Sequence, residues 1–176
     1  MLLRFTLLAC LLSLGWLATS GGDAQDKKPK PSVAESIHVP AGFEIDLLHV
    51  ADPKSEGSWI CMAKDHKGRL IISGQQGQPM LRVTLKDGKV ASIDKLNLPI
   101  SGAMGMLQAF DSFYVNGIGP KGFGLYRCKD TKGTDQYDDV QLLKSFKGGG
   151  EHGPHGVALG KGQRAVSPAQ WGDVAL

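Results

Sequence analysis

The sequence has little of three features that would place it in familiar protein classes. No segment longer than about ten residues has a clean helical period, which argues against a helical fold. The lysines and acidic residues are interspersed and the formal net charge is +3, so no basic stripe indicates nucleic-acid binding. Cysteine is scarce, with three residues in a chain of 176.

The cysteines leave the redox state open. Cys10 lies in the apolar N-terminal run, so Cys61 and Cys128 are the two that would remain in a processed chain. Export would permit a disulfide between them. Two buried free thiols are equally compatible with the sequence.

The N-terminus has the three-part layout of a secretory signal peptide. A short basic start precedes an apolar run over 5–18, and small residues follow as far as Ala24. We therefore predict a signal peptide over 1–24, removed after Ala24, and a periplasmic or secreted protein. An uncleaved membrane anchor is the alternative. A lipoprotein signal ending at Cys10 would lie too early, because the apolar run continues beyond it.

A polar, lysine- and proline-rich stretch over 25–36 cannot bury apolar surface and is typical of a disordered linker. From about Ile37 the pattern becomes that of an all-β protein, with short β-rich runs between turn signals. Turns are expected at 65–68, 86–89 and 111–112. The expected strands are 43–50, 59–63, 69–73, 81–85, 104–110, 113–116, 124–128 and 140–143.

The strand pattern repeats. Trp59, Met104 and His155 occupy similar places in it, 45 and 51 residues apart. A repeat of about 40–50 residues with four strands is typical of a β-propeller blade. We predict a partial β-propeller over 37–162, with two to three four-stranded blades and inner strands that start near these three residues. An antiparallel sandwich with regularly spaced hairpins is the alternative.

The last residues depart from the repeat. After Gly162 a returning strand is expected, but 163–176 shows no alternation and places Pro168 where the strand would run. A premature stop or a frameshift in a longer reading frame would give this pattern.

The stretch "GGGEHGPHG", 148–156, contains five glycines and two of the five histidines of the chain. Its glycines would let the backbone approach a ligand closely. Glu151, His152 and His155 are the candidate site residues. A His-x-x-His pair without a third and fourth ligand is weak evidence for a metal, and a structural role in tying the loop to nearby carbonyls is a further alternative.

An acidic stretch over 130–139 is similar to a calcium loop. Lys132 and Thr134 stand at the second and third ligand places, and an ammonium there opposes calcium binding. We therefore interpret the stretch as an acidic turn and predict no metal site.

Four segments, "VPAGFEIDLLH", "GSWICMAKDHKGRLIISGQQG", "GLYRCKDTKGTDQYDDVQLL" and "GGGEHGPHGVALG", resemble the N-terminal blades of a bacterial propeller family. The family comprises the sorbosone/glucose dehydrogenase-like, membrane-bound dehydrogenase proteins of planctomycetes. The resemblance covers 37–160 and implies a six-bladed propeller. It also implies pyrroloquinoline quinone (PQQ) with calcium as cofactor in the intact family member, a sugar or sugar-aldehyde substrate, and in many relatives a cytochrome c module.

Within that resemblance, His155 would be the base that takes the substrate's hydroxyl proton, with His152 as second choice and Glu151 orienting either imidazole. The chain would be the N-terminal part of an exported, quinone-dependent dehydrogenase-like propeller. We expect it to be inactive alone and to bind no cofactor tightly. The alternative function is a non-catalytic, extracytoplasmic, propeller-like binding module.

Overall fold

The computed structural model describes residues 36–147, 155–160 and 165–166. The chain divides into two compact units, Met1–Ile45 and Asp46–Leu176. In the first unit, the described residues contain one turn, in which the Phe43 amide donates to the Pro40 carbonyl at 3.1 Å. Within the described ranges, no helix is long and apolar enough to cross a membrane. The predicted signal peptide and nearly all of the predicted linker lie outside these ranges.

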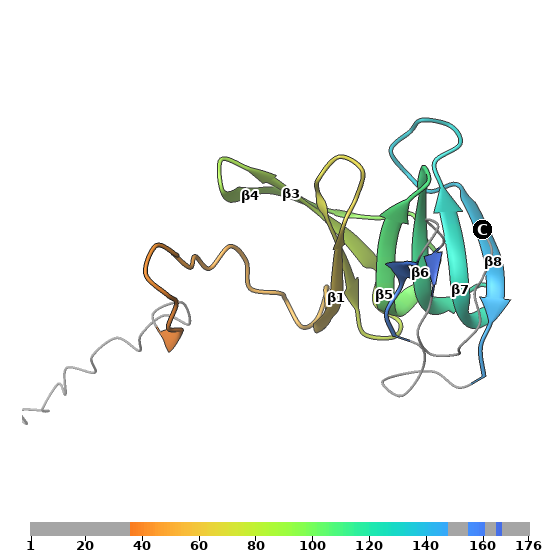
Figure 1. The fold of residues 1–176 in the computed structure, drawn as a ribbon, viewed down its shortest axis with the longest axis horizontal. Helices are drawn as coiled ribbons and strands as arrows, with labels where there is room; N and C mark the ends of the chain where they lie inside the picture. Colours follow the sequence, from red (N-terminus) through yellow and green to blue (C-terminus); the bar gives the residue numbers. More distant parts are fainter. Residues whose placement is uncertain (1–35, 148–154, 161–164, 167–176) are drawn as a thin grey trace, which may run out of the picture. The chain divides into compact units, whose positions relative to one another are not determined.

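The second unit is built from two antiparallel four-stranded sheets, each with its strands in chain order (Figure 1). The first sheet comprises β1 (Trp59–Lys64), β2 (Leu70–Gly74), β3 (Met80–Lys86) and β4 (Lys89–Lys95). The second comprises β5 (Ser101–Ala109), β6 (Ser112–Gly119), β7 (Gly122–Lys129) and β8 (Asp139–Ser145). A short strand β9 (Ala158–Leu159) pairs with β10 (Ala165–Val166). The prediction of an all-β fold is confirmed.

The tight turns follow from local sequence. In the β3–β4 hairpin, Asp87 and Gly88 have φ of 50° and 73°, the left-handed pair that matches the twist of the flanking strands. The β5–β6 hairpin turns at Phe110 and Asp111, with φ of 48° and 51°, one residue earlier than predicted. In the β1–β2 turn, Gly68 has φ of 79° and its amide donates to the Asp65 carbonyl. Each of these three turns therefore contains an aspartate, and two of them also contain a glycine with a left-handed backbone.

Two sequence-based expectations need correction. The strand predicted over 43–50 is not formed, because this stretch pairs with no sheet in the described part of the chain. Alternation of apolar and polar residues is therefore not sufficient for a strand here. The region 163–176, expected to lack a returning strand, contributes β10, which pairs with β9. Trp59 begins β1 as predicted, Met104 lies inside β5, and His155 lies just before β9.

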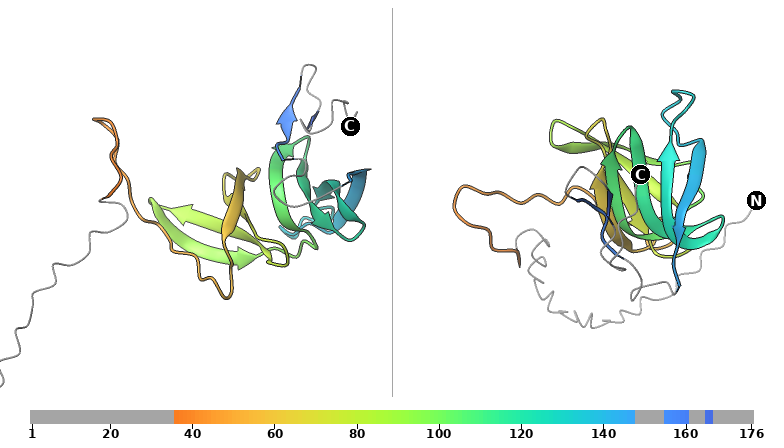
Figure 2. Two further views of the ribbon diagram at one scale, coloured as in Figure 1. Left: turned by 90° about the horizontal axis from the view of Figure 1, so that it is seen from below. Right: turned by 45° about the vertical axis from the view of Figure 1, so that its right-hand side comes forward.

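The largest apolar core lies between the two sheets. It combines buried residues of β2 and β3 with buried residues of the second sheet and of the β4–β5 connection. Its members are Ile71, Met80, Leu96, Leu98, Ile100, Ala103, Met106, Phe113, Val115, Tyr126, Cys128 and Tyr137. β5 contacts both β1 and β2, and the two views of Figure 2 show it beside the first sheet.

Each sheet also carries apolar residues on its other face. In the first sheet Ile72, Leu81 and Val83 form a second cluster, and in the second sheet Tyr114 and Leu125 form a third with Phe146. Successive residues of a strand point to opposite faces, so Ile71 and Ile72 serve different clusters. Neither sheet therefore has a purely polar face, which is the pattern of sheets stacked in a series.

Both cysteines of the sheets are free thiols, Cys61 on β1 and Cys128 on β7. Burial raises the pKa of Cys128 to about 12 and also raises the pKa of Cys61. Of the two redox states that the sequence allowed, the structure has the reduced one, with thiols that form little thiolate near neutral pH.

Two phenylalanines at the β5–β6 hairpin allow a matched test of the inter-sheet core. Phe113 is 0 % exposed and stacks on Tyr137 with ring centroids 5.5 Å apart, whereas Phe110 is 45 % exposed. We expect Phe113→Ala to lower the free energy of unfolding by about 3–5 kcal/mol through loss of burial and the cavity left behind. Phe110→Ala should change it by less than about 1 kcal/mol. Urea unfolding of both variants measures this, and equal effects would contradict the assigned core.

Candidate functional site

The structure describes one of the three predicted site residues. Glu151 and His152 lie outside the described residues. His155 lies within them, directly before the segment that leads into β9, and is exposed. Hydrogen bonds to its backbone carbonyl hold it next to the second sheet.

Asn116 on β6 holds the 155–156 backbone. Its side-chain Nδ2 donates to the carbonyl of His155 at 3.1 Å and to that of Gly156 at 3.4 Å. A Cβ added to Gly105 on β5 would lie 1.8 Å from the His155 carbonyl oxygen, so only glycine permits this approach. The segment is tied to the sheet through its carbonyls, while the His155 side chain stays exposed.

The 130–139 loop is held together by hydrogen bonds to its own carboxylates. Asp130 accepts hydrogen bonds from the amides of Thr134 and Asp135 at 3.0 and 2.7 Å. Asp138 accepts from the amide and the hydroxyl of Thr131 at 2.6 and 2.8 Å, and Lys132 lies 3.4 Å from it. The carboxylates thus bind donors of their own loop. Among the described residues, no group of three or more His, Cys, Asp or Glu side chains is placed to hold a metal ion.

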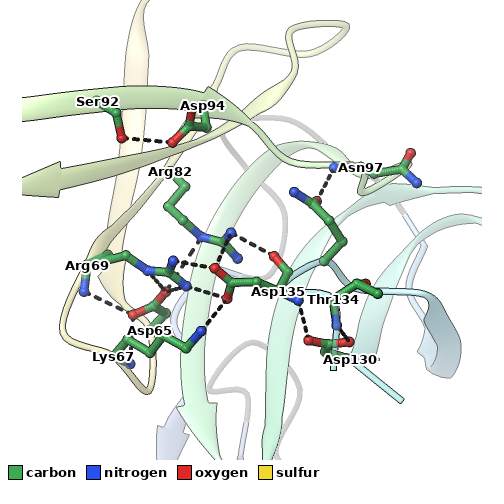
Figure 3. A network of polar contacts seen from close by, with 11 residues as sticks. Asp65, Lys67, Arg69, Arg82, Ser92, Asp94, Asn97, Asp130, Thr134 and Asp135 are labelled. Carbon is green, nitrogen blue, oxygen red and sulfur yellow. Dashed lines mark hydrogen bonds and ion pairs between the residues drawn. The ribbon is translucent and has the colours of Figure 1, made fainter. Parts of the chain in front are cut away.

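A network of charged side chains joins the β1–β2 turn to this loop (Figure 3). Asp65 has a fully buried side chain, and its Oδ1 accepts the backbone amides of Lys67 and Arg69, each at 2.9 Å. Arg69 Nε also donates to Asp65 Oδ2 at 2.8 Å. One carboxylate therefore both shapes the turn and fixes the Arg69 guanidinium.

Asp135, on the loop of the second sheet, completes the network. Arg69 donates to both of its carboxylate oxygens, at 2.5 and 2.7 Å, and Lys67 Nζ lies 3.0 Å from one of them. Arg82 on β3 donates to the Asp135 backbone carbonyl at 2.7 Å and lies 3.6 Å from Asp65. Residues of both sheets are thus connected by charge-assisted hydrogen bonds.

The surroundings keep both carboxylates ionised. Burial by itself would raise the pKa of Asp65, but hydrogen bonds from Arg69 and Lys67 outweigh it and leave the pKa lowered. The hydrogen bond from Arg69 holds the pKa of Asp135 well below its usual range, and it raises the pKa of Arg69 in return. With every charge partnered, the network is suited to joining the sheets rather than to proton transfer.

Sequence reasoning did not identify this network. Asp65 was assigned only to a turn and Asp135 only to an acidic loop. The available signal was Arg82, a charged residue inside the apolar run Met80–Val83. Its partner lies 53 residues further along the chain, and no local pattern reports such a separation.

In comparisons with known proteins, no family model, no curated protein and no solved structure matches the chain.

The network predicts a large effect of an isosteric change. Asp65→Asn keeps one oxygen for the turn amides but removes the charge that faces Arg69 and Arg82, whose side chains are 16 % and 6 % exposed. We expect the free energy of unfolding to fall by at least about 2 kcal/mol at pH 7, because a buried charge loses its partner. Asp87→Asn, in an exposed turn, is the matched control and should change it by less than about 0.5 kcal/mol.

The pH dependence of the same variants gives the second measurement. Folding lowers the pKa of Asp65 and Asp135, so their contribution is present above the unfolded-state pKa of about 4. It is lost as the pH falls through the folded-state pKa values. Stability of the unaltered chain should therefore drop on acidification below about pH 4, and less steeply in Asp65→Asn. Parallel pH profiles for the two proteins would contradict the assignment.

Proposed function

We propose that the two sheets are the first two blades of a β-propeller in an exported dehydrogenase-like protein that acts on sugars or sugar aldehydes. The observation that supports this most is the apolar clusters on both faces of each sheet. A four-stranded sheet that is apolar on both faces needs a neighbour on each side, and a ring of blades supplies one.

Strand order and sequence spacing agree with this proposal. Each sheet is a meander in chain order, and the innermost strand of a second blade would be β5, which contacts β1. The β9–β10 pair would belong to a third blade. Of the four segments that resemble the sorbosone/glucose dehydrogenase-like family, the second (57–77) contains β1 and β2, the third (124–143) covers most of β7 and β8, and the fourth (148–160) contains β9, whereas the first (39–49) precedes both sheets.

His155, His152 and Glu151 are the residues that we propose for the reaction. An imidazole titrates near neutral pH and can accept the proton of a substrate hydroxyl. Asn116 would fix the backbone of His155, so that the exposed imidazole projects from a defined position. Glu151 would orient one imidazole through a hydrogen bond.

The described residues do not fit the calcium ion that accompanies PQQ in the family that the sequence resembles. The carboxylates of Asp130 and Asp138 are engaged by amides of their own loop. In the proposal, PQQ and calcium are therefore bound by other blades of the propeller, as is any cytochrome c module. Because a propeller closes with about four to eight blades, this chain alone would be inactive.

A non-catalytic binding module outside the cytoplasm is the second candidate. It is favoured by one observation: the contacts that hold the 155–156 segment at the second sheet run through its backbone carbonyls.

The activity test uses two proteins. The full chain, given PQQ, calcium, an artificial electron acceptor and either aldoses or sorbosone, should give no dye reduction. The product of the longest reading frame found by resequencing past the codon for Gly162 should reduce the dye. In that product His155→Ala should lower the rate at least about 100-fold, because a general base is lost. His38→Ala is the matched control and should leave the rate unchanged.

Three other results of these tests would change the proposal. Dye reduction by the full chain that disappears in His155→Ala would show that the two sheets suffice. A longer product that binds sugars without oxidising them would support the binding module. A longer reading frame with no further four-strand repeats would refute the propeller.

A further inference from the structure

The third strands of the two sheets carry an arginine at equivalent positions. In the first sheet Arg82 on β3 pairs with Ile71 on β2, and in the second sheet Arg127 on β7 pairs with Tyr114 on β6. Residues that lie directly opposite each other on neighbouring strands share a face of the sheet. Each arginine is therefore on the same face as its partner, and the two sheets can be compared position by position.

In the first sheet, this face contacts the second sheet in three ways. The Ile71 side chain lies in the core between the sheets. Ser73 Oγ accepts a hydrogen bond of 2.9 Å from the amide of Ala103, near the beginning of β5. Arg82 donates to the Asp135 carbonyl at 2.7 Å and lies 3.4 Å from the Asp135 carboxylate. One apolar and two polar contacts thus join this face to the sheet that follows in the chain.

In the second sheet, two of the three equivalent residues make equivalent contacts with the segment that follows. Tyr114 is 2 % exposed and lies in the cluster against which Val157 packs. Asn116 has the position that the serine has in the first sheet, and it donates to the carbonyls of His155 and Gly156. The interface between the first two sheets therefore begins again on the face of the second sheet that is turned away from the first.

The third equivalent residue, Arg127, makes no such contact in the described part of the chain. It donates to Gln141 at 2.7 Å and lies 3.9 Å from Asp139, and both of these residues belong to β8 of its own sheet. The side chain of Arg127 is 32 % exposed, whereas that of Arg82 is 6 % exposed. A guanidinium has five N–H donors in a fixed fork, so Arg127 can bind a further acceptor.

We propose that this face of the second sheet binds a third four-stranded sheet, and that Arg127 donates to an acidic residue in the loop between the third and fourth strands of that sheet. The acidic residue would correspond to Asp135, which lies 53 residues after Arg82. The same separation counted from Arg127 leads past residue 176. This inference rests on the proposed function, because the third sheet is the next blade of the propeller, and it names the contact that joins the blades.

Urea unfolding of the full chain gives the first test. Arg82→Gln should raise the equilibrium constant for unfolding at least about 30-fold, because buried carboxylates lose a partner. Arg127→Gln should raise it less than about threefold, because its charged partner in the chain is an exposed residue of its own sheet. Lys89→Gln, at an exposed position of β4, is the matched control for the loss of one positive charge and should have an equally small effect. Equal effects of the two arginine variants would overturn the proposal, since Arg127 would then be complete within its own sheet.

The second test uses the product of the longest reading frame at the locus. If this product has a third four-strand repeat, Arg127→Gln should raise its equilibrium constant for unfolding at least about 30-fold. Changing the acidic residue that corresponds to Asp135 into its amide should have a similar effect. The double variant should be no less stable than the weaker single variant, because both changes remove one contact. Lys89→Gln should again have an effect below about threefold.

The results separate this inference from the proposed function. An effect of Arg127→Gln below about threefold in a product with a third repeat would overturn the inference and leave the propeller standing. A product without a third repeat would refute both. Coupling between Arg127 and the acidic residue without dye reduction would refute only the proposed activity.

Discussion

The fold depends on how the buried Asp65 carboxylate is compensated. Its side chain is 0 % exposed, and an ion in that position is tolerated only with partners in good geometry. Arg69 and two turn amides supply them from its own hairpin. Arg69 also donates to Asp135. The guanidinium that neutralises Asp65 therefore also binds a loop of the other sheet.

The apolar core and this network constrain the sheets in complementary ways. Burial of apolar area between the sheets supplies most of the free energy but little directional preference. The bidentate contact of Arg69 with Asp135 and the bond from Arg82 to its carbonyl fix one relative placement. The Tyr137 ring, two residues after Asp135 in the same loop, packs on Phe113 in the core between the sheets.

The sequence predicts what local chemistry determines. Asp-Gly at 87–88 and glycine at 68 dictate hairpins through their left-handed backbone, and those turns form where expected. The 43–50 stretch has the right alternation, but a strand also requires an edge to pair with, and that is not a local property. Asn116 and Gly105 hold the 155–156 backbone from strands far away in sequence. Neither residue type signals such a contact, so the anchoring could not be predicted, and the roles of Glu151 and His152 stay predictions.

The central claim is that the two sheets form one cooperative unit, held by a shared core and by the Arg69–Asp135 contact. Native-state hydrogen exchange tests it most directly. If the claim holds, the slowest amides of β2 and of β6 exchange through openings with the same free energy and the same dependence on denaturant. If the β2 amides open at a clearly lower free energy and with a smaller denaturant slope than those of β6, the sheets unfold separately and the claim is wrong.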